Sequence, residues 1–88
     1  MLWGNVSYIL GSPMSKKILD CLNKKSPLAP LQIANECNIA RSNVSTKLVE
    51  LRKRKLVDCI NPDARKWRFY KITKEGKRVL IEAEKINQ

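Results

Sequence analysis

The sequence contains no histidine, only three glycines, and three cysteines separated by long intervals. Histidine is a frequent general base and metal ligand, and glycine-rich loops hold phosphate groups in many enzymes. Neither is available here, and no pair of carboxylates lies in the apolar pattern typical of an active-site cleft. We therefore expect a protein that is not an enzyme and that uses no cofactor.

The three cysteines are Cys21, Cys37 and Cys59, and they form no CxxC pair. Without histidine they do not provide the usual ligand set of zinc, so no metal site is predicted. Each lies in an apolar pattern, which favours small buried side chains in a reducing compartment. A redox or metal-sensing role is the less favoured alternative.

Long hydrophobic runs are also missing. No stretch approaches the roughly 20 apolar residues that cross a bilayer. The apolar start, MLWGNVSYIL, lacks the basic region of a signal peptide. These absences predict a soluble cytoplasmic protein without a membrane partner. The 88 residues fit one small domain, residues 1–88, whose limited core favours oligomerisation.

What the sequence has in excess is positive charge, because 18 lysines and arginines face 8 acidic residues and leave a net charge of +10. The excess is uneven. Residues 41–72 carry ten basic and three acidic residues, whereas residues 1–40 contribute +2 and residues 73–88 contribute +1. A concentrated positive patch favours a polyanion, either nucleic acid or anionic lipid. Lysines that served only solubility would be spread more evenly.

Apolar residues at helical spacing predict three helices in the first two thirds of the chain. In the third helix, Val44, Leu48 and Leu51 share one face, which must point to the core. Asn38 is suited to the left-handed conformation that ends a helix, so a tight turn before the third helix is expected. The predicted helices run from Ser12-Pro13 to Lys24-Lys25, from just after Pro30 to Asn38, and from the polar stretch at 41–46 to the basic run at 52–55.

The pattern then changes to β-branched and aromatic residues, which predicts strands over residues 56–60 and 66–72. The segment NPDAR, residues 61–65, is a turn between them. Thr73 is placed to cap a last helix. A short helical stripe is also expected near the N-terminus. The fold class predicted from these elements is mainly α with a small β-hairpin.

The start of the third helix is unusually rich in poor helix formers: Ser42, Asn43, Ser45 and Thr46. One or two of them would satisfy the free backbone N–H groups of a helix start, and four are more than capping requires. The major groove of DNA admits one α-helix, and the end that enters needs short polar side chains near base edges. A cap at Ser42 with solvated neighbours is the alternative interpretation.

The order of elements resembles the winged helix-turn-helix of bacterial and archaeal transcription regulators, closest to the MarR- and ArsR-like groups. The stretch LQIANECNIARSNVSTKLVELRKRKLV resembles the helix-turn-helix, and RKWRFYKITKEGKRVL resembles the wing strand and the helix after it. The resemblance implies a three-helix core with a wing and terminal helices. Its parts are an N-terminal apolar segment (1–11), the core and wing (12–72) and a C-terminal helix (73–88).

Two features of those groups are missing from the sequence. The closely spaced cysteines of ArsR-type metal sensors are absent, so metal sensing is not expected. The long extra helices of MarR-type dimers are absent as well, so the usual ligand pocket between helices is not expected and no small-molecule effector is assigned.

The expected partner is double-stranded DNA. Asn43 is a candidate reader of adenine, and Arg41 a candidate for guanine or phosphate. The basic hairpin tip would contact phosphates or the narrow groove beside the helix, although cationic residues also protect ordinary edge strands. The predicted DNA-binding residues are Arg41, Ser42, Asn43, Ser45, Thr46, Lys47, Lys53, Arg65, Lys66 and Arg68.

The second strand carries four large side chains whose faces alternate. The resemblance places Tyr70 and Ile72 in the core. Trp67 and Phe69 then need cover from the neighbouring strand, a partner subunit or nucleic acid, and core or interface packing is favoured.

Two apolar stripes at the chain ends predict a homodimer, because a core of this size has limited capacity to bury both. Packing of both stripes within one subunit is the alternative. The expected interface residues are Trp3, Val6, Ile9, Leu10, Val79, Leu80, Ala83 and Ile86. A two-fold dimer would recognise an inverted repeat.

The sequence thus predicts a cytoplasmic, nucleoid-associated regulator that binds specific double-stranded DNA. A winged-helix module for protein assembly, or for RNA or single strands, is the rival reading.

Overall fold

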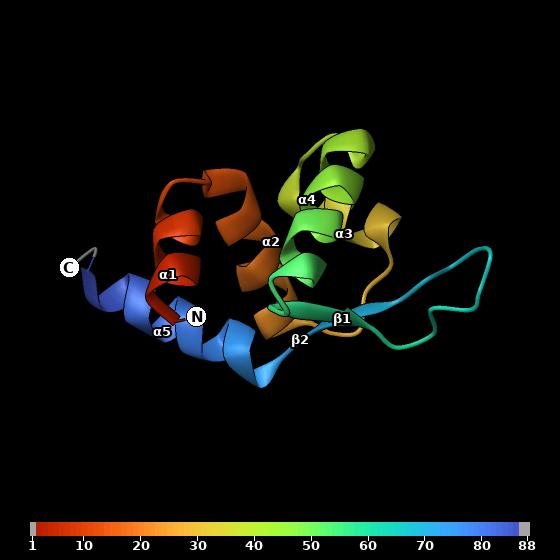
Figure 1. Ribbon diagram of the computed structural model, residues 1–88. Helices are drawn as coiled ribbons and strands as arrows, with labels where there is room; N and C mark the ends of the chain where they lie inside the picture. The colour runs from red at the N-terminus through yellow and green to blue at the C-terminus, as the bar shows by residue number, and fades with distance from the viewer. Residues whose placement is uncertain (1, 87–88) are drawn as a thin grey trace.

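The computed structural model describes residues 2–86. Within this range, four helices are followed by two short strands and a last helix, and the helices form a bundle from which one long loop projects (Figure 1). This arrangement confirms the predicted fold class, mainly α with a small hairpin. The elements are α1 (Leu2–Leu10), α2 (Pro13–Lys24), α3 (Pro30–Cys37), α4 (Arg41–Lys53), β1 (Val57–Cys59), β2 (Tyr70–Ile72) and α5 (Lys74–Ile86).

Helix α2 is the centre of the core and packs against α1, α3, α4 and α5. Its buried residues Ile18, Leu19 and Leu22 are fully shielded from solvent. The helix begins at Pro13, as predicted, because the fixed φ of proline suits the first helical position. Ser12 occupies the N-cap position, but its side chain makes no capping hydrogen bond; its hydroxyl donates to Ser15 Oγ at 3.0 Å.

The turn between α3 and α4 is short because Asn38 adopts the left-handed conformation, with φ 54° and ψ 48°. This confirms the role predicted for Asn38. The backbone N–H of Ile39 then donates to the Ala34 carbonyl at 3.1 Å, and the Ile39 side chain packs against the core. The turn therefore fixes the angle at which α4 leaves α3.

The hairpin is shorter than the sequence predicts. Strands β1 and β2 pair antiparallel, with Val57 opposite Ile72 and Cys59 opposite Tyr70. Leu28, in the segment before α3, also pairs with Tyr70 through two backbone hydrogen bonds of 3.0 and 2.8 Å. The base of the wing is thus held from both sides of Tyr70.

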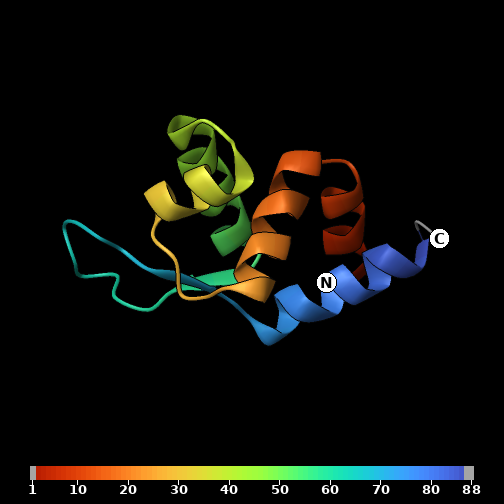
Figure 2. The ribbon, with the colours of Figure 1, turned by 180° about the vertical axis from the view of Figure 1, so that it is seen from behind.

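Residues 60–69 form the projecting loop seen in Figures 1 and 2, so the expected strands at 56–60 and 66–72 are wrong at their outer ends. The physical reason is Asn61. Its amide oxygen accepts from the Phe69 N–H at 2.8 Å, and its amide nitrogen donates to the Trp67 carbonyl at 3.0 Å. Trp67 has a φ of 55°, which a strand does not permit.

Helices α1 and α5 lie side by side at the end of the molecule away from the loop (Figures 1 and 2). One subunit thus buries most of both terminal stripes against each other, which corrects the expectation that a core of this size has limited capacity to bury both. Leu10 is half-buried, and Trp3 and Ile86 remain exposed. The predicted interface residues that are buried inside the subunit are Val6, Ile9, Val79, Leu80 and Ala83.

Helix α5 starts beside the hairpin. Thr73 caps it as predicted, because its hydroxyl oxygen accepts from the Gly76 N–H at 3.0 Å. Glycine is required at position 76 because α5 lies very close to the hairpin there. A Cβ at this position would lie 2.7 Å from Ile72 Cγ1 and closer still to the Leu56 carbonyl oxygen. No helix within residues 2–86 has the length and apolar character needed to cross a membrane.

Candidate nucleic-acid interface

The first turns of α4 present a row of small polar side chains to solvent. Ser42, Asn43, Ser45 and Thr46 are all exposed, whereas Val44, Leu48 and Leu51 are buried and fix the rotation of the helix. The N-cap position belongs to Ala40, so the alternative reading of Ser42 as the cap is wrong. The polar row is therefore not explained by capping.

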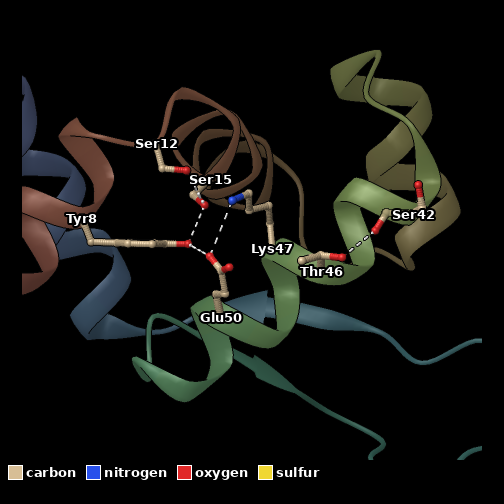
Figure 3. Close-up of polar contacts among 7 residues, drawn as sticks. All are labelled: Tyr8, Ser12, Ser15, Ser42, Thr46, Lys47 and Glu50. Atoms are coloured by element: carbon tan, nitrogen blue, oxygen red, sulfur yellow. Dashed lines mark hydrogen bonds and ion pairs between the residues drawn. The ribbon is translucent and has the colours of Figure 1, made fainter.

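Thr46 adds a local contact within this row, shown in Figure 3. Its hydroxyl donates to the Ser42 backbone carbonyl at 3.0 Å. This bond uses the hydroxyl hydrogen and leaves the oxygen lone pairs available as acceptors. Thr46 thus presents an acceptor and a methyl group at the exposed helix surface.

The opposite end of α4 is joined to α1 by a polar network (Figure 3). The Tyr8 hydroxyl donates to the Glu50 carboxylate and lies 2.8 Å from Ser15 Oγ. Lys47 Nζ lies 3.6 Å from Glu50 on the same helix. Lys47 is half-buried and is thus held at the side of α4 by Glu50.

Arg54, just past α4, completes the contact with α1. Its guanidinium lies 4.0 Å from the centre of the Tyr8 ring and donates to Asn5 Oδ1 at 3.1 Å. The hydrogen bond from Tyr8 lowers the pKa of Glu50, with nearby Lys47 adding to the effect. Burial, followed by the Glu50 carboxylate, raises the pKa of Tyr8.

The wing carries Arg65, Lys66 and Arg68 on its exposed surface. Arg68 Nε donates to the Ala64 carbonyl at 2.7 Å, which braces the loop. These cations line a pocket of about 450 Å³ together with Arg41 from the start of α4. Arg41, from the start of α4, and the wing cations, which are far apart in the sequence, therefore border the same pocket.

Lys53 lies at the far end of α4 from this pocket. It lines a shallow groove with Arg52, and Arg68 contributes to the same groove from the wing. Arg52 was not among the predicted DNA-binding residues, and its place in the basic run at 52–55 was the available signal. Arg68 thus borders both the pocket at the start of α4 and the groove at its far end.

The structure also shows residues at the pocket that sequence reasoning missed as a site. Trp67 and Tyr70 line it from the wing, and Leu31 lines it from α3. Trp67 is 59% exposed, so of the expected core or interface packing, packing in the core of its own subunit is wrong. The signal in the sequence was the indole flanked by cations in RKWR.

A second polar cavity, of about 300 Å³, lies between α2 and α3 and is lined by both Cys21 and Cys37. Burial raises the pKa of Cys21 to about 11, and the adjacent Cys37 adds to the shift. Within residues 2–86, no three histidine, cysteine or acidic side chains lie together so as to hold a metal ion. The two thiols lie 16 positions apart in the sequence, and only the packing of the helices brings them together.

Residues 10–60 match the family model described as a helix-turn-helix domain. The chain belongs to this family. The match covers α2, α3 and α4 and extends to β1. It is a family of non-enzymatic domains, which agrees with the residue inventory. A comparison with curated proteins finds no match.

Solved structures with the same fold include regulators from bacteria and an archaeon. A MarR family protein from Bacillus stearothermophilus is 18% identical, with a TM-score of 0.75 over 99% of this chain and 64% of that one. The PcaV transcriptional regulator of Streptomyces coelicolor, solved with its natural ligand, is 21% identical, with a TM-score of 0.74 over 88% of this chain and 58% of that one.

The archaeal regulator BldR of Sulfolobus solfataricus is 23% identical, with a TM-score of 0.66 over 82% of this chain and 54% of that one. These likenesses confirm the winged helix-turn-helix fold and the predicted resemblance to MarR-type regulators. The chain spans just over half to just under two thirds of the length of these three structures.

Proposed function

We propose that the chain binds specific double-stranded DNA and acts as a transcriptional regulator, with α4 in the major groove and the wing on the adjacent backbone or minor groove. The observation that carries this proposal is that Arg41, which directly precedes the exposed polar row of α4, lines one pocket together with the cations of the wing. A helix that carries base-reading groups beside a cationic hairpin that holds phosphates is the arrangement that duplex recognition requires.

The exposed residues of α4 have different proposed roles in DNA binding, according to their side-chain chemistry. Asn43 is exposed and has the donor and acceptor pair that matches the edge of adenine. Ser42, Ser45 and Thr46 are short enough to let the helix approach the base edges. Arg41 lies where the helix start meets the wing, so it is suited to a phosphate or a guanine.

The charge distribution supports a nucleic acid over a neutral partner. The segment 41–72 contains α4 and the wing and carries most of the net charge of +10. If the protein contacts about six to ten phosphates, affinity falls by roughly 10³ to 10⁵ between 50 and 200 mM salt. Selection of duplexes from a random pool, followed by a salt titration on the selected site, tests this. A binding constant that does not change with salt contradicts it.

The rival function is a winged helix that binds RNA or single strands, or that serves protein assembly. Equal or tighter binding to the single strands of the selected site, measured beside the duplex, would favour that rival. The exposed polar row on α4 favours the duplex, because single-strand binding depends on stacking platforms and not on a groove-sized helix.

A homodimer remains part of the proposal, on a smaller surface than the sequence indicated. The paired terminal helices carry three large apolar side chains that are exposed: Trp3 on α1, and Ile81 and Ile86 on α5. A two-fold contact there would present two α4 helices to an inverted repeat. Light scattering is expected to give twice the 10.1 kDa of one chain. A monomeric mass that persists with duplex present rules the dimer out.

A further inference from the structure

The wing holds an indole in an exposed position. Trp67 is 59% exposed although tryptophan is among the side chains that gain most from burial. The backbone around it is fixed: Asn61 binds the Trp67 carbonyl and the Phe69 N–H, and Arg68 binds the Ala64 carbonyl. A side chain that is costly to expose, on a loop held by side-chain hydrogen bonds, points to a surface that becomes covered.

The pocket beside Trp67 combines two kinds of side chain. Arg41, Arg65, Lys66 and Arg68 supply four positive charges, and Leu31 and the rings of Trp67 and Tyr70 supply apolar faces. No acidic residue is among the described residues that line it. By contrast, the cavity at Cys21 and Cys37 includes Asp20 and Glu36 beside its lysines. The wing pocket therefore fits an occupant that is anionic and partly apolar.

The DNA backbone has this alternation, because each negatively charged phosphate is followed by a deoxyribose with an apolar face. A phosphate alone would use the arginines and leave the indole exposed, and an apolar peptide would leave four cations without partners. The pocket also opens beside the start of α4, so a strand bordering the groove that α4 enters passes it. Charge and shape therefore favour the backbone over other occupants.

We propose that this pocket holds a segment of the DNA sugar–phosphate backbone, with the indole of Trp67 packed against a deoxyribose between phosphates bound by Arg41 and Arg68. The proposal rests on the proposed duplex binding and adds an apolar contact to it. Because every nucleotide carries the same sugar, the contact contributes affinity without sequence preference. Its further role is to fix the wing against the strand.

The two tryptophans of the chain allow a direct test. In Trp3→Phe the remaining indole is Trp67, and in Trp67→Phe it is Trp3 on α1, which is 61% exposed. Each variant is titrated with the selected duplex while binding is followed independently by the anisotropy of labelled DNA. For Trp3→Phe, we expect saturating duplex to change the indole emission and to reduce its quenching by acrylamide. For Trp67→Phe, both signals should stay nearly constant.

Affinity supplies the second measurement. Trp67→Ala is expected to weaken the selected duplex and a random duplex alike, by roughly tenfold, because an apolar contact is lost from both complexes. Trp67→Phe should retain part of this affinity, and Asn23→Ala, at an exposed position of α2, should retain all of it. Thermal unfolding of each variant confirms that the fold is kept, which is expected because Trp67 lies outside the core.

The outcomes separate the two proposals. If Trp3→Phe binds duplex by anisotropy while Trp67 emission and quenching stay unchanged, the backbone pocket is wrong and duplex binding stands. If Trp67→Ala weakens only the selected site, the indole reads sequence and the backbone assignment is again wrong. If the wild-type protein binds no duplex by anisotropy, the proposed function fails together with the pocket.

Discussion

The Tyr8 hydroxyl in α1 donates a hydrogen bond to the Glu50 carboxylate in α4, 42 positions along the chain. The same hydroxyl lies 2.8 Å from Ser15 Oγ in α2, so three helices meet at one oxygen atom (Figure 3). Arg54 covers the Tyr8 ring and binds Asn5. The proposed recognition helix is thus oriented by α1 as well as by its own buried face.

Removal of this hydroxyl should lower the stability of the fold. Tyr8→Phe leaves the ring in place beneath Arg54 and deprives Glu50 and Ser15 of their partner, so we expect the melting temperature at pH 7 to fall by a few degrees. Tyr70→Phe is the matched control, because the Tyr70 hydroxyl makes no hydrogen bond among the described residues. An unchanged melting temperature for Tyr8→Phe would show that the contact contributes nothing.

The same variant should change the pH dependence of stability. The pKa of Glu50 is lowered in the fold, chiefly by Tyr8, so its contribution is present above its usual value of 4.5 and is lost as the pH falls through the lower folded value. The pKa of Tyr8 is raised by burial and by Glu50, so its contribution is present below 10.0 and is lost at higher pH. Thermal unfolding of Tyr8→Phe across both ranges should show smaller losses than the wild type.

Two glycines in helices should respond in opposite ways to alanine. Gly76→Ala places a Cβ against the Leu56 carbonyl and Ile72, so we expect a loss of about 2–3 kcal/mol. Gly4→Ala in α1 meets nothing within 4 Å and should gain about 0.5–1 kcal/mol from higher helix propensity. Chemical denaturation of both variants measures the difference. If both variants change the free energy of unfolding by the same amount, the contact between α5 and the hairpin adjusts to make room for the methyl group of the substituted alanine.

Residues of α4 and of the wing should affect DNA binding differently. Asn43→Ala is expected to weaken the selected site by about 1–3 kcal/mol and random duplex much less, because a base contact is lost. Arg65→Ala should weaken both duplexes similarly and reduce the salt dependence by about one charge. Asn23→Ala, at an exposed position of α2, serves as the control. If Asn43→Ala leaves the sequence preference intact, Asn43 does not read a base.

The thiol of Cys21 should be slow to alkylate at neutral pH. Its pKa is raised to about 11 by burial and by Cys37. As the pH rises, the thiolate fraction of Cys21 therefore still increases at pH values where an ordinary thiol, of pKa about 8.5, is already almost fully ionised. Iodoacetamide labelling, followed residue by residue with mass spectrometry, should give a Cys21 rate that still rises between pH 9 and 10. In Cys37→Ser the profile should move to lower pH. A plateau of the wild-type rate by pH 9 would contradict the assignment.

Local signals predicted most of the fold. Pro13 starts α2, Asn38 turns the chain before α4, and the stripe at Val44, Leu48 and Leu51 faces the core, because each depends on a few neighbouring residues. The wing was predicted less well. The alternating aromatic residues predicted a strand that begins at Lys66. Instead, the side chain of Asn61 hydrogen-bonds to the backbone of Trp67 and Phe69, in place of hydrogen bonds between two strands.

Contacts between distant segments were beyond reach of the pattern. The two terminal stripes were recognised as apolar, but an apolar stripe does not show which surface it packs against. In the structure, α1 packs against α5 within one subunit. Arg41 and the wing cations line one pocket, and Cys21 and Cys37 line another, because segments distant in the sequence pack together. For the candidate site, residue types and charge were thus predictable, and the pocket that joins them was not.

The pairing of Leu28 with Tyr70 has a consequence for the proposed DNA binding. Because two backbone hydrogen bonds join the segment before α3 to the strand that leads out of the wing, the wing base and the helix pair α3–α4 form one frame. The spacing between α4 and that base is then set in the free protein. A duplex whose groove width does not match this spacing must itself deform, so binding would respond to the local stiffness of the duplex even at base pairs that no side chain touches.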